Sequence, residues 1–146
     1  MIDNREAILA RLLVVCSEVA GVRNAYRNKV KLSDIDAPYV AIFDADEEGA
    51  EDPPARTPRA ARRVAMTPQI LAVCGAPSNE VGTDVNTLRS RIIDAIMTDA
   101  TLAGLTLDGQ GVRYEGCTTE LAMGRDMTAA VGISFSFTYL LRATAA

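Results

Sequence analysis

Apolar residues recur at steps of three and four positions in two stretches of the chain, which is the period of an amphipathic helix. The first stripe consists of Ile8, Leu9, Leu12, Leu13, Val15, Cys16 and Val19. Asp3 or Asn4 can cap the start of this helix, and Gly21 can end it because glycine enters the left-handed conformation freely. The second stripe consists of Val81, Val85, Leu88, Ile92, Ile93 and Ile96. The pattern therefore predicts two helices, each with one apolar face.

Five other segments have patterns typical of β-strands. They are residues 22–28, 39–43, 63–75, 112–121 and 133–141. The last of them alternates almost without a break. Ile133, Phe135, Phe137, Tyr139 and Leu141 share one face, and Ser134, Ser136 and Thr138 share the other.

The strand predicted at residues 63–75 also alternates, but a proline interrupts it. One face carries Val64, Met66, Ile70, Ala72 and Cys74, and the other carries Leu71 and Val73. Because proline cannot donate a hydrogen bond to a neighbouring strand, Pro68 predicts either an edge position or a bulge.

The predicted elements follow the order α-β-β-β-α-β-β. Two amphipathic helices need a common apolar surface, and an antiparallel sheet with one covered face supplies it. Sequential strands favour hairpin connections and hence antiparallel pairing. We therefore expect a single α+β domain of 146 residues, with an antiparallel or mixed sheet and both helices on one face. The hydroxyl-rich face of the last strand is then exposed to solvent or available to a partner.

Residues 44–63 differ in composition from the rest of the chain. Six acidic residues come first, namely Asp44, Asp46, Glu47, Glu48, Glu51 and Asp52. Four arginines follow among three prolines, namely Arg56, Arg59, Arg62 and Arg63. Such a segment is poorly suited to a core, and its prolines block a helix. We expect a long mobile loop at about residues 44–63, and predict that its ten charged side chains form an interface between subunits.

The composition excludes several kinds of active site. The chain has no histidine, which removes the commonest general acid-base and metal-ligating side chain. A Ser-His-Asp or Cys-His site is therefore impossible within it. The formal net charge of −4 argues against nonspecific binding to nucleic acid or to an anionic membrane, because such binding needs clustered positive charge.

The cysteines and carboxylates predict neither disulfides nor a metal centre. The chain has three cysteines, Cys16, Cys74 and Cys117, which is an odd number, and they are widely spaced. We expect all three to be buried as small hydrophobic residues. The acidic residues offer oxygen ligands to a hard cation, but a solvated loop is the interpretation we favour. We predict no catalytic residue, no metal and no cofactor. The polar start of the chain and the lack of a long apolar run lead us to expect no signal peptide and no membrane anchor.

Seven segments of the chain also carry a family resemblance. They are residues 5–12, 22–28, 38–47, 66–70, 85–92, 112–117 and 132–139. The last of these reads Gly132-Ile133-Ser134-Phe135-Ser136-Phe137-Thr138-Tyr139. In order, spacing and texture they resemble the tail terminator proteins of long-tailed bacteriophages, the minor-tail-protein-U-like group. The resemblance covers nearly the whole chain, and no short motif defines the family.

The resemblance implies a structural virion protein that catalyses no reaction. Subunits of such a protein form a homo-hexameric ring at the head-proximal end of the tail tube. The ring stops tube polymerisation and offers a joining surface to the head–tail connector. The implied partners are copies of the chain itself, the tail tube protein and the connector protein. DNA would pass through the ring without specific binding, and the protein would join the virion tail in the bacterial cytoplasm.

The charged segment predicts how such a ring would form. We hypothesise that residues 44–63 become ordered when subunits meet, with the arginines of one subunit contacting carboxylates of its neighbour. Single exposed ion pairs contribute only about 0–1 kcal/mol, so several must act together. The wall of the channel is expected to be neutral or acidic, because a cationic wall would hold the passing DNA.

Three other interpretations stay open on the sequence. A related phage neck or tail-completion protein would have a similar texture. A small ligand-binding regulatory α+β module would have a pocket with converging polar groups, for example near Thr118, Thr119 and Arg125. A metal-dependent enzyme would use Asp44 and Asp46, although no histidine or well-spaced third ligand accompanies them.

Overall fold

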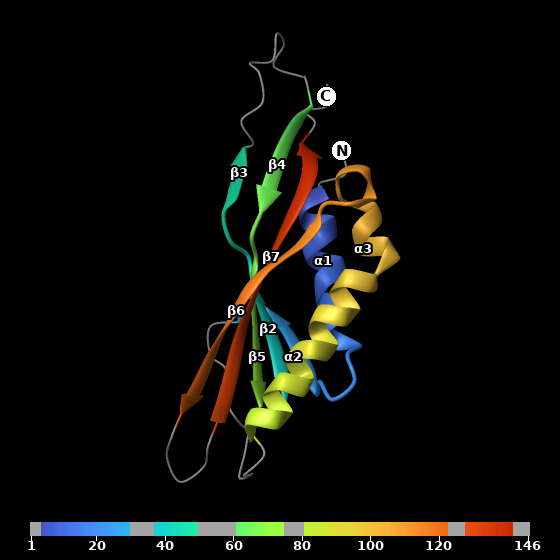
Figure 1. Cartoon of the computed structure of the whole chain (residues 1–146). Helices are drawn as coiled ribbons and strands as arrows, with labels where there is room; N and C mark the ends of the chain where they lie inside the picture. Colours follow the sequence, from blue (N-terminus) through green and yellow to red (C-terminus); the bar gives the residue numbers. More distant parts are fainter. Residues whose placement is uncertain (1–3, 30–36, 50–60, 75–80, 123–127, 142–146) are drawn as a thin grey trace.

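A computed structural model describes residues 4–29, 37–49, 61–74, 81–122 and 128–141 of the chain. Its helical elements are α1 (Asn4–Ser17), α2 (Val81–Thr98), α3 (Ala100–Gly104) and the 3-10 turn η2 (Leu107–Gly109). Its strands are β1 (Asn24–Arg27), β2 (Tyr39–Phe43), β3 (Glu47–Gly49), β4 (Arg62–Met66), β5 (Gln69–Cys74), β6 (Val112–Ala122) and β7 (Thr128–Leu141). Figure 1 shows a long twisted sheet with the helices along one side. The predicted α+β class is confirmed.

The strand β7 is central, because three other strands pair with it. Its first half pairs with β5, its second half pairs with β4, and β6 pairs along its other edge, all antiparallel. Strand β2 then adds to β5 and β3 adds to β4. The segments β2–β3 and β4–β5 are therefore two long strands that are each interrupted once. Strand β1 pairs parallel with β2, which makes the sheet mixed.

The two interrupted strands break at the same level. Residues 44–46 separate β2 from β3, opposite Thr67 and Pro68 between β4 and β5. The N–H of Thr67 donates to the carbonyl of Asp46 at 3.3 Å across this break. Pro68 is buried in the sheet interior, so the predicted edge position is wrong. The other prediction, a bulge, agrees with the register, because residues 44–46 lie opposite only two residues, Thr67 and Pro68. Since proline cannot donate to a neighbouring strand, the strand is interrupted at this point.

The helices cover one face of the sheet, as predicted. Alternate residues of β7 from Ala129 to Tyr139 are buried in a core that also contains the apolar stripes of α1 and α2. Ser134, Ser136 and Thr138 lie on the opposite face and are half-buried. The alternation of β7 therefore orients the sheet relative to its two covering helices.

A smaller apolar cluster lies on the face opposite the helices. Tyr39, Ala41 and Val73 are buried there and alternate with core residues along β2 and β5. The ring of Tyr26 packs edge-on against Tyr39, with centroids 6.1 Å apart. The sequence did not predict this cluster, because a continuous apolar run such as residues 39–43 does not show that both of its faces are buried.

The predicted charged loop is shorter than its composition indicates. Residues 47–49 form β3 and Arg62 begins β4, so residues 44–63 are not one loop. Glutamate is disfavoured in strands, but pairing of β3 with β4 overrides this weak preference. The structure does not describe residues 50–60, so the central part of the predicted loop lies outside the described residues.

Candidate functional site

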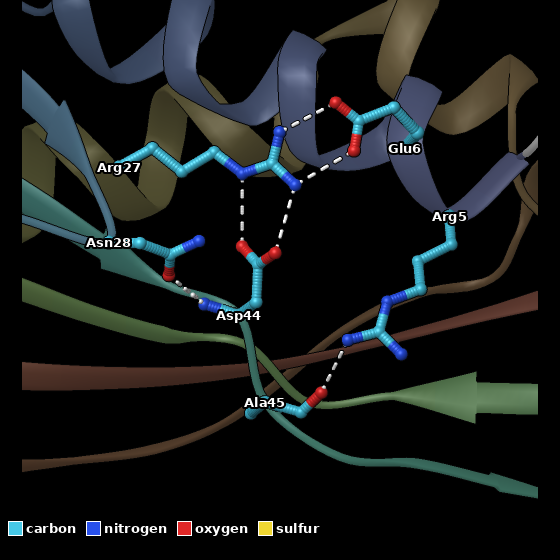
Figure 2. A network of polar contacts seen from close by, with 6 residues as sticks. All are labelled: Arg5, Glu6, Arg27, Asn28, Asp44 and Ala45. Atoms are coloured by element: carbon cyan, nitrogen blue, oxygen red, sulfur yellow. Dashed lines mark hydrogen bonds and ion pairs between the residues drawn. The ribbon is translucent and has the colours of Figure 1, made fainter.

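The first acidic residue of the predicted interface is bound within its own subunit. Arg27 Nε and Nη2 donate to the carboxylate of Asp44 at 3.0 and 2.9 Å. The same guanidinium donates to Glu6 of α1 at 2.7 and 2.8 Å. Figure 2 shows this double fork, together with Asn28 accepting from the Asp44 N–H and Arg5 donating to the Ala45 carbonyl. These contacts tie α1 and β1 to the break between β2 and β3.

The hydrogen bonds from Arg27 hold the pKa of Asp44 below its ordinary value of 3.8. The Asp44 carboxylate is largely shielded, with 28% of its side chain exposed. The unfolded chain therefore binds a proton at a higher pH than the folded protein does. It follows that Asp44 stabilises the fold above about pH 4, and that this contribution is lost as the pH falls through the depressed pKa.

We accordingly expect the thermal midpoint of Asp44→Asn to fall less steeply between pH 5 and pH 3 than that of the wild type. Asp46→Asn is the matched control, because it removes an exposed carboxylate only two residues away. Differential scanning calorimetry at several pH values measures both. An Asp44→Asn curve with the wild-type slope would contradict the role given to the Arg27 pair.

The remaining predicted interface residues fall into three groups. Glu47 accepts a hydrogen bond from the Tyr139 hydroxyl and is therefore engaged within the subunit. Asp46, Glu48, Arg62 and Arg63 are exposed on or next to the hairpin of β3 and β4. Glu51, Asp52, Arg56 and Arg59 lie outside the described residues. Two acidic and two basic side chains of the predicted interface are therefore exposed close to one hairpin.

A groove lies on the sheet face opposite the helices, beside this hairpin. Its volume is about 540 Å³. Residues of β4, β6, β7 and η2 line it, including Arg63, Arg113, Ser136 and Thr138. Glu115 also lines it, accepting from the Ser136 hydroxyl at 2.8 Å and lying 3.4 Å from Arg113 Nε. A surface with both signs of charge and several hydroxyls is suited to polar protein contacts and poorly suited to a polyanion.

Cys117 is exposed, which corrects the prediction that all three cysteines are buried. Its Sγ lies 3.1 Å from Arg89 Nε of α2, and Arg89 Nη2 donates to the Tyr114 hydroxyl at 2.9 Å. Hydrogen bonds from Tyr114 and Arg89 hold the pKa of the Cys117 thiol below its usual value of 9.0. Burial raises the pKa of Cys16 to about 12. The thiols therefore differ in both access and ionisation.

We expect a thiol reagent to modify one cysteine per native chain at pH 8, and three after unfolding, because thiolate is the reactive form. Mass spectrometry should place the label on Cys117. Replacing Arg89 with methionine should slow this labelling, since it removes a hydrogen bond that favours the thiolate. Fast labelling of Cys16 or Cys74 in the folded protein would contradict the structure.

Two of the three residues named for the ligand-binding alternative can be placed in the described structure. Thr118 and Thr119 are exposed on β6, and Arg125 lies outside the described residues. A separate open hollow of about 280 Å³ lies between the ends of α2, β2 and β5, where Arg91 Nη1 donates to the Ala20 carbonyl at 3.2 Å. Within the described ranges no group of three or more cysteine, aspartate or glutamate side chains is placed to hold a metal ion.

Comparison with known proteins adds no relative. No protein-family model matches the chain, and no curated protein sequence matches it. The family resemblance therefore rests on the seven segments quoted above. Among the described helices, none is both long and apolar enough to cross a membrane.

Proposed function

We propose that this protein is a phage tail terminator, a structural virion protein that forms a ring on the head-proximal end of the tail tube. The observation that carries this proposal is that the resembling segments follow the described elements of one domain in order. Residues 5–12 lie in α1, 85–92 lie in α2 and 132–139 lie in β7, while 38–47 run from the start of β2 to the start of β3 and 66–70 join β4 to β5. A resemblance that follows the described elements in order supports a shared architecture.

The helix-free face of the sheet also supports an assembly role. The sheet leaves one face without helices, and that face carries the groove of mixed charge. Copies of one chain that meet through two different surfaces build a ring when the rotation between them closes. The ring would end tube growth by covering the last tube layer, and its other side would meet the head–tail connector.

Fewer charged residues are candidates for the subunit interface than the ten that the sequence predicts. Asp44 and Glu47 are engaged within their own subunit, so they are not the neighbour's partners in our proposal. The described candidates at the hairpin of β3 and β4 are the exposed residues Asp46, Glu48, Arg62 and Arg63. Several such pairs must act together, since exposed pairs contribute only about 0–1 kcal/mol each.

The proposal is tested by offering the protein to tail tubes made from the tube protein of the same genome. Electron microscopy should show a ring at one end of each tube, and native mass spectrometry should give the mass of six copies. The triple variant Arg59→Glu, Arg62→Glu, Arg63→Glu should lose the ring at low salt if the charged hairpin contributes. A protein that stays monomeric and leaves the tubes bare would contradict the proposal.

A further inference from the structure

The two outermost strands of the sheet differ sharply in length and surroundings. Among the described strands, β6 pairs with β7 alone and β1 pairs with β2 alone. The outer edge of β6 is eleven residues long, whereas β1 has four residues, all half-buried. Unpaired strand edges are templates for strand addition. The third edge strand, β3, has only three residues and carries Glu47 and Glu48, two features that protect an edge from pairing.

The direction of the backbone groups on β6 follows from its pairing with β7. The N–H of Thr138 donates to the Gly111 carbonyl at 2.9 Å, so even-numbered residues of β7 face β6. The register of β6 shifts between Tyr114 and Gly116, which marks a β-bulge. After this bulge, the residues of β6 that face β7 include Gly116 and Thr118. The alternate residues Cys117 and Thr119 therefore direct their N–H and C=O groups outward, away from β7.

The same reasoning applies to β1. The N–H of Asn28 donates to the Ile42 carbonyl at 2.8 Å, so even-numbered residues of β1 face β2. Ala25 and Arg27 then direct their backbone groups outward. Arg27 is held by its side-chain bonds to Glu6 and Asp44, which fixes this short strand in place before any partner arrives.

We propose that β1 of one copy adds to the outer edge of β6 of the next copy, so that the sheet continues from subunit to subunit around the ring. This inference rests on the proposed function. The chain directions in the sheet make β1 and β6 antiparallel, so copies in one orientation bring them together as an antiparallel pair. Because the two edges differ, the contact is heterologous and can close into a ring.

Strand geometry favours one register for this pairing. With Ala25 opposite Thr119, both outward-directed residues can exchange backbone hydrogen bonds. Tyr26 then lies opposite Thr118 and Arg27 lies opposite Cys117, so that all four residues of β1 are paired. The bulge between Tyr114 and Gly116 falls at the end of the paired segment. A bulge twists the strand edge away and limits further pairing. The four residues of β1 can therefore pair with the part of β6 that follows the bulge.

A proline at an outward-directed position tests the pairing. Thr119→Pro removes an N–H that β6 does not use toward β7, so the subunit should fold while strand addition is blocked. Thr119→Val keeps the strand propensity and is the matched control. By sedimentation velocity with and without tubes, we expect Thr119→Pro to lose the ring and Thr119→Val to retain it, with circular dichroism confirming that both fold. A ring in Thr119→Pro would overturn the inference and leave the proposed function intact.

Cross-linking tests the register and the identity of the partner strand. The variant Ala25→Cys, Cys117→Ser, Thr119→Cys carries one new thiol on each edge, within reach of a disulfide if the proposed pairing is right. Oxidation should give a ladder of covalently linked copies beyond the dimer, and Ala25→Cys with Cys117→Ser alone should not. Disulfide dimers through Cys117 in the wild type would indicate pairing of β6 with β6 and would overturn the inference. A wild type that never assembles would overturn both proposals.

Discussion

Replacing Phe135 with alanine is expected to lower the free energy of unfolding by about 3–5 kcal/mol. Phe135 is fully buried at the centre of β7, the strand with which three others pair. Its ring packs against Tyr114 and Phe137, with centroid distances of 5.6 and 6.2 Å. Truncation removes buried apolar surface and leaves a cavity in the core between the sheet and the helices. Because domains of this size are stable by about 5–15 kcal/mol in total, the variant should be close to unfolding.

Urea titration followed by circular dichroism measures this loss. Ser134→Ala is the matched control, because Ser134 is the neighbouring residue of the same strand on the opposite face. We expect its effect to stay within about 0.5 kcal/mol, as for most substitutions away from a core. Similar losses for the two variants would contradict the orientation of β7, and with it the placement of the helices on one face.

Replacing Gly111 with alanine is expected to destabilise the protein by about 2–3 kcal/mol, because the added methyl group has no room. A Cβ at this position would overlap the Thr138 carbonyl oxygen and lie 2.7 Å from Thr106 Cβ. Gly111 also fixes the start of β6: its N–H donates to Thr106 Oγ1 at 2.9 Å, and its carbonyl accepts from Thr138. The substitution should therefore weaken the hydrogen bonds at the start of β6 as well as lower the free energy of unfolding.

Gly104→Ala is the control for this effect. Gly104 ends the short helix α3, and an added Cβ would meet no atom within 4 Å. Alanine costs less conformational entropy than glycine in a helix, so this variant should be unchanged or more stable by up to about 1 kcal/mol. Thermal unfolding of the two variants compares a crowded glycine with an open one. Equal midpoints would show that the β6–β7 contact is looser than described.

The sequence predicts the main layers of the fold because each depends on a local period. The helical stripes and the alternation of residues 133–141 indicate directly which side chains face the core. The structure places the stripes and the alternate residues from Ile133 to Tyr139 in one core, whereas Leu141 at the end of β7 is 40% exposed. Burial of Cys16 and Cys74 is also confirmed. Local period does not reveal interactions between distant segments. The fork of Arg27 joins residues 21 and 17 positions away, and nothing in the local pattern predicts that choice of partner.

The misplaced predictions have the same cause. The composition of residues 44–63 predicts a loop, but pairing with β4 makes a strand of residues 47–49. Strand-like neighbours predict burial of Cys117, but β6 is an edge strand and Arg89 of α2 reaches its thiol. Likewise, Pro68 predicts an edge, whereas both long strands break at its level in the interior. In each case the position of the strand within the sheet decides the outcome. The period of apolar residues along the sequence does not indicate that position.

We propose that this chain acts by assembling copies of itself on the end of a tail tube. This is tested by growing tubes from their subunits in the presence of a small amount of this protein and measuring tube lengths by electron microscopy. We expect shorter tubes that stop growing and carry one ring each at a single end. Tubes that keep elongating at the same rate with no ring at either end would contradict the proposal.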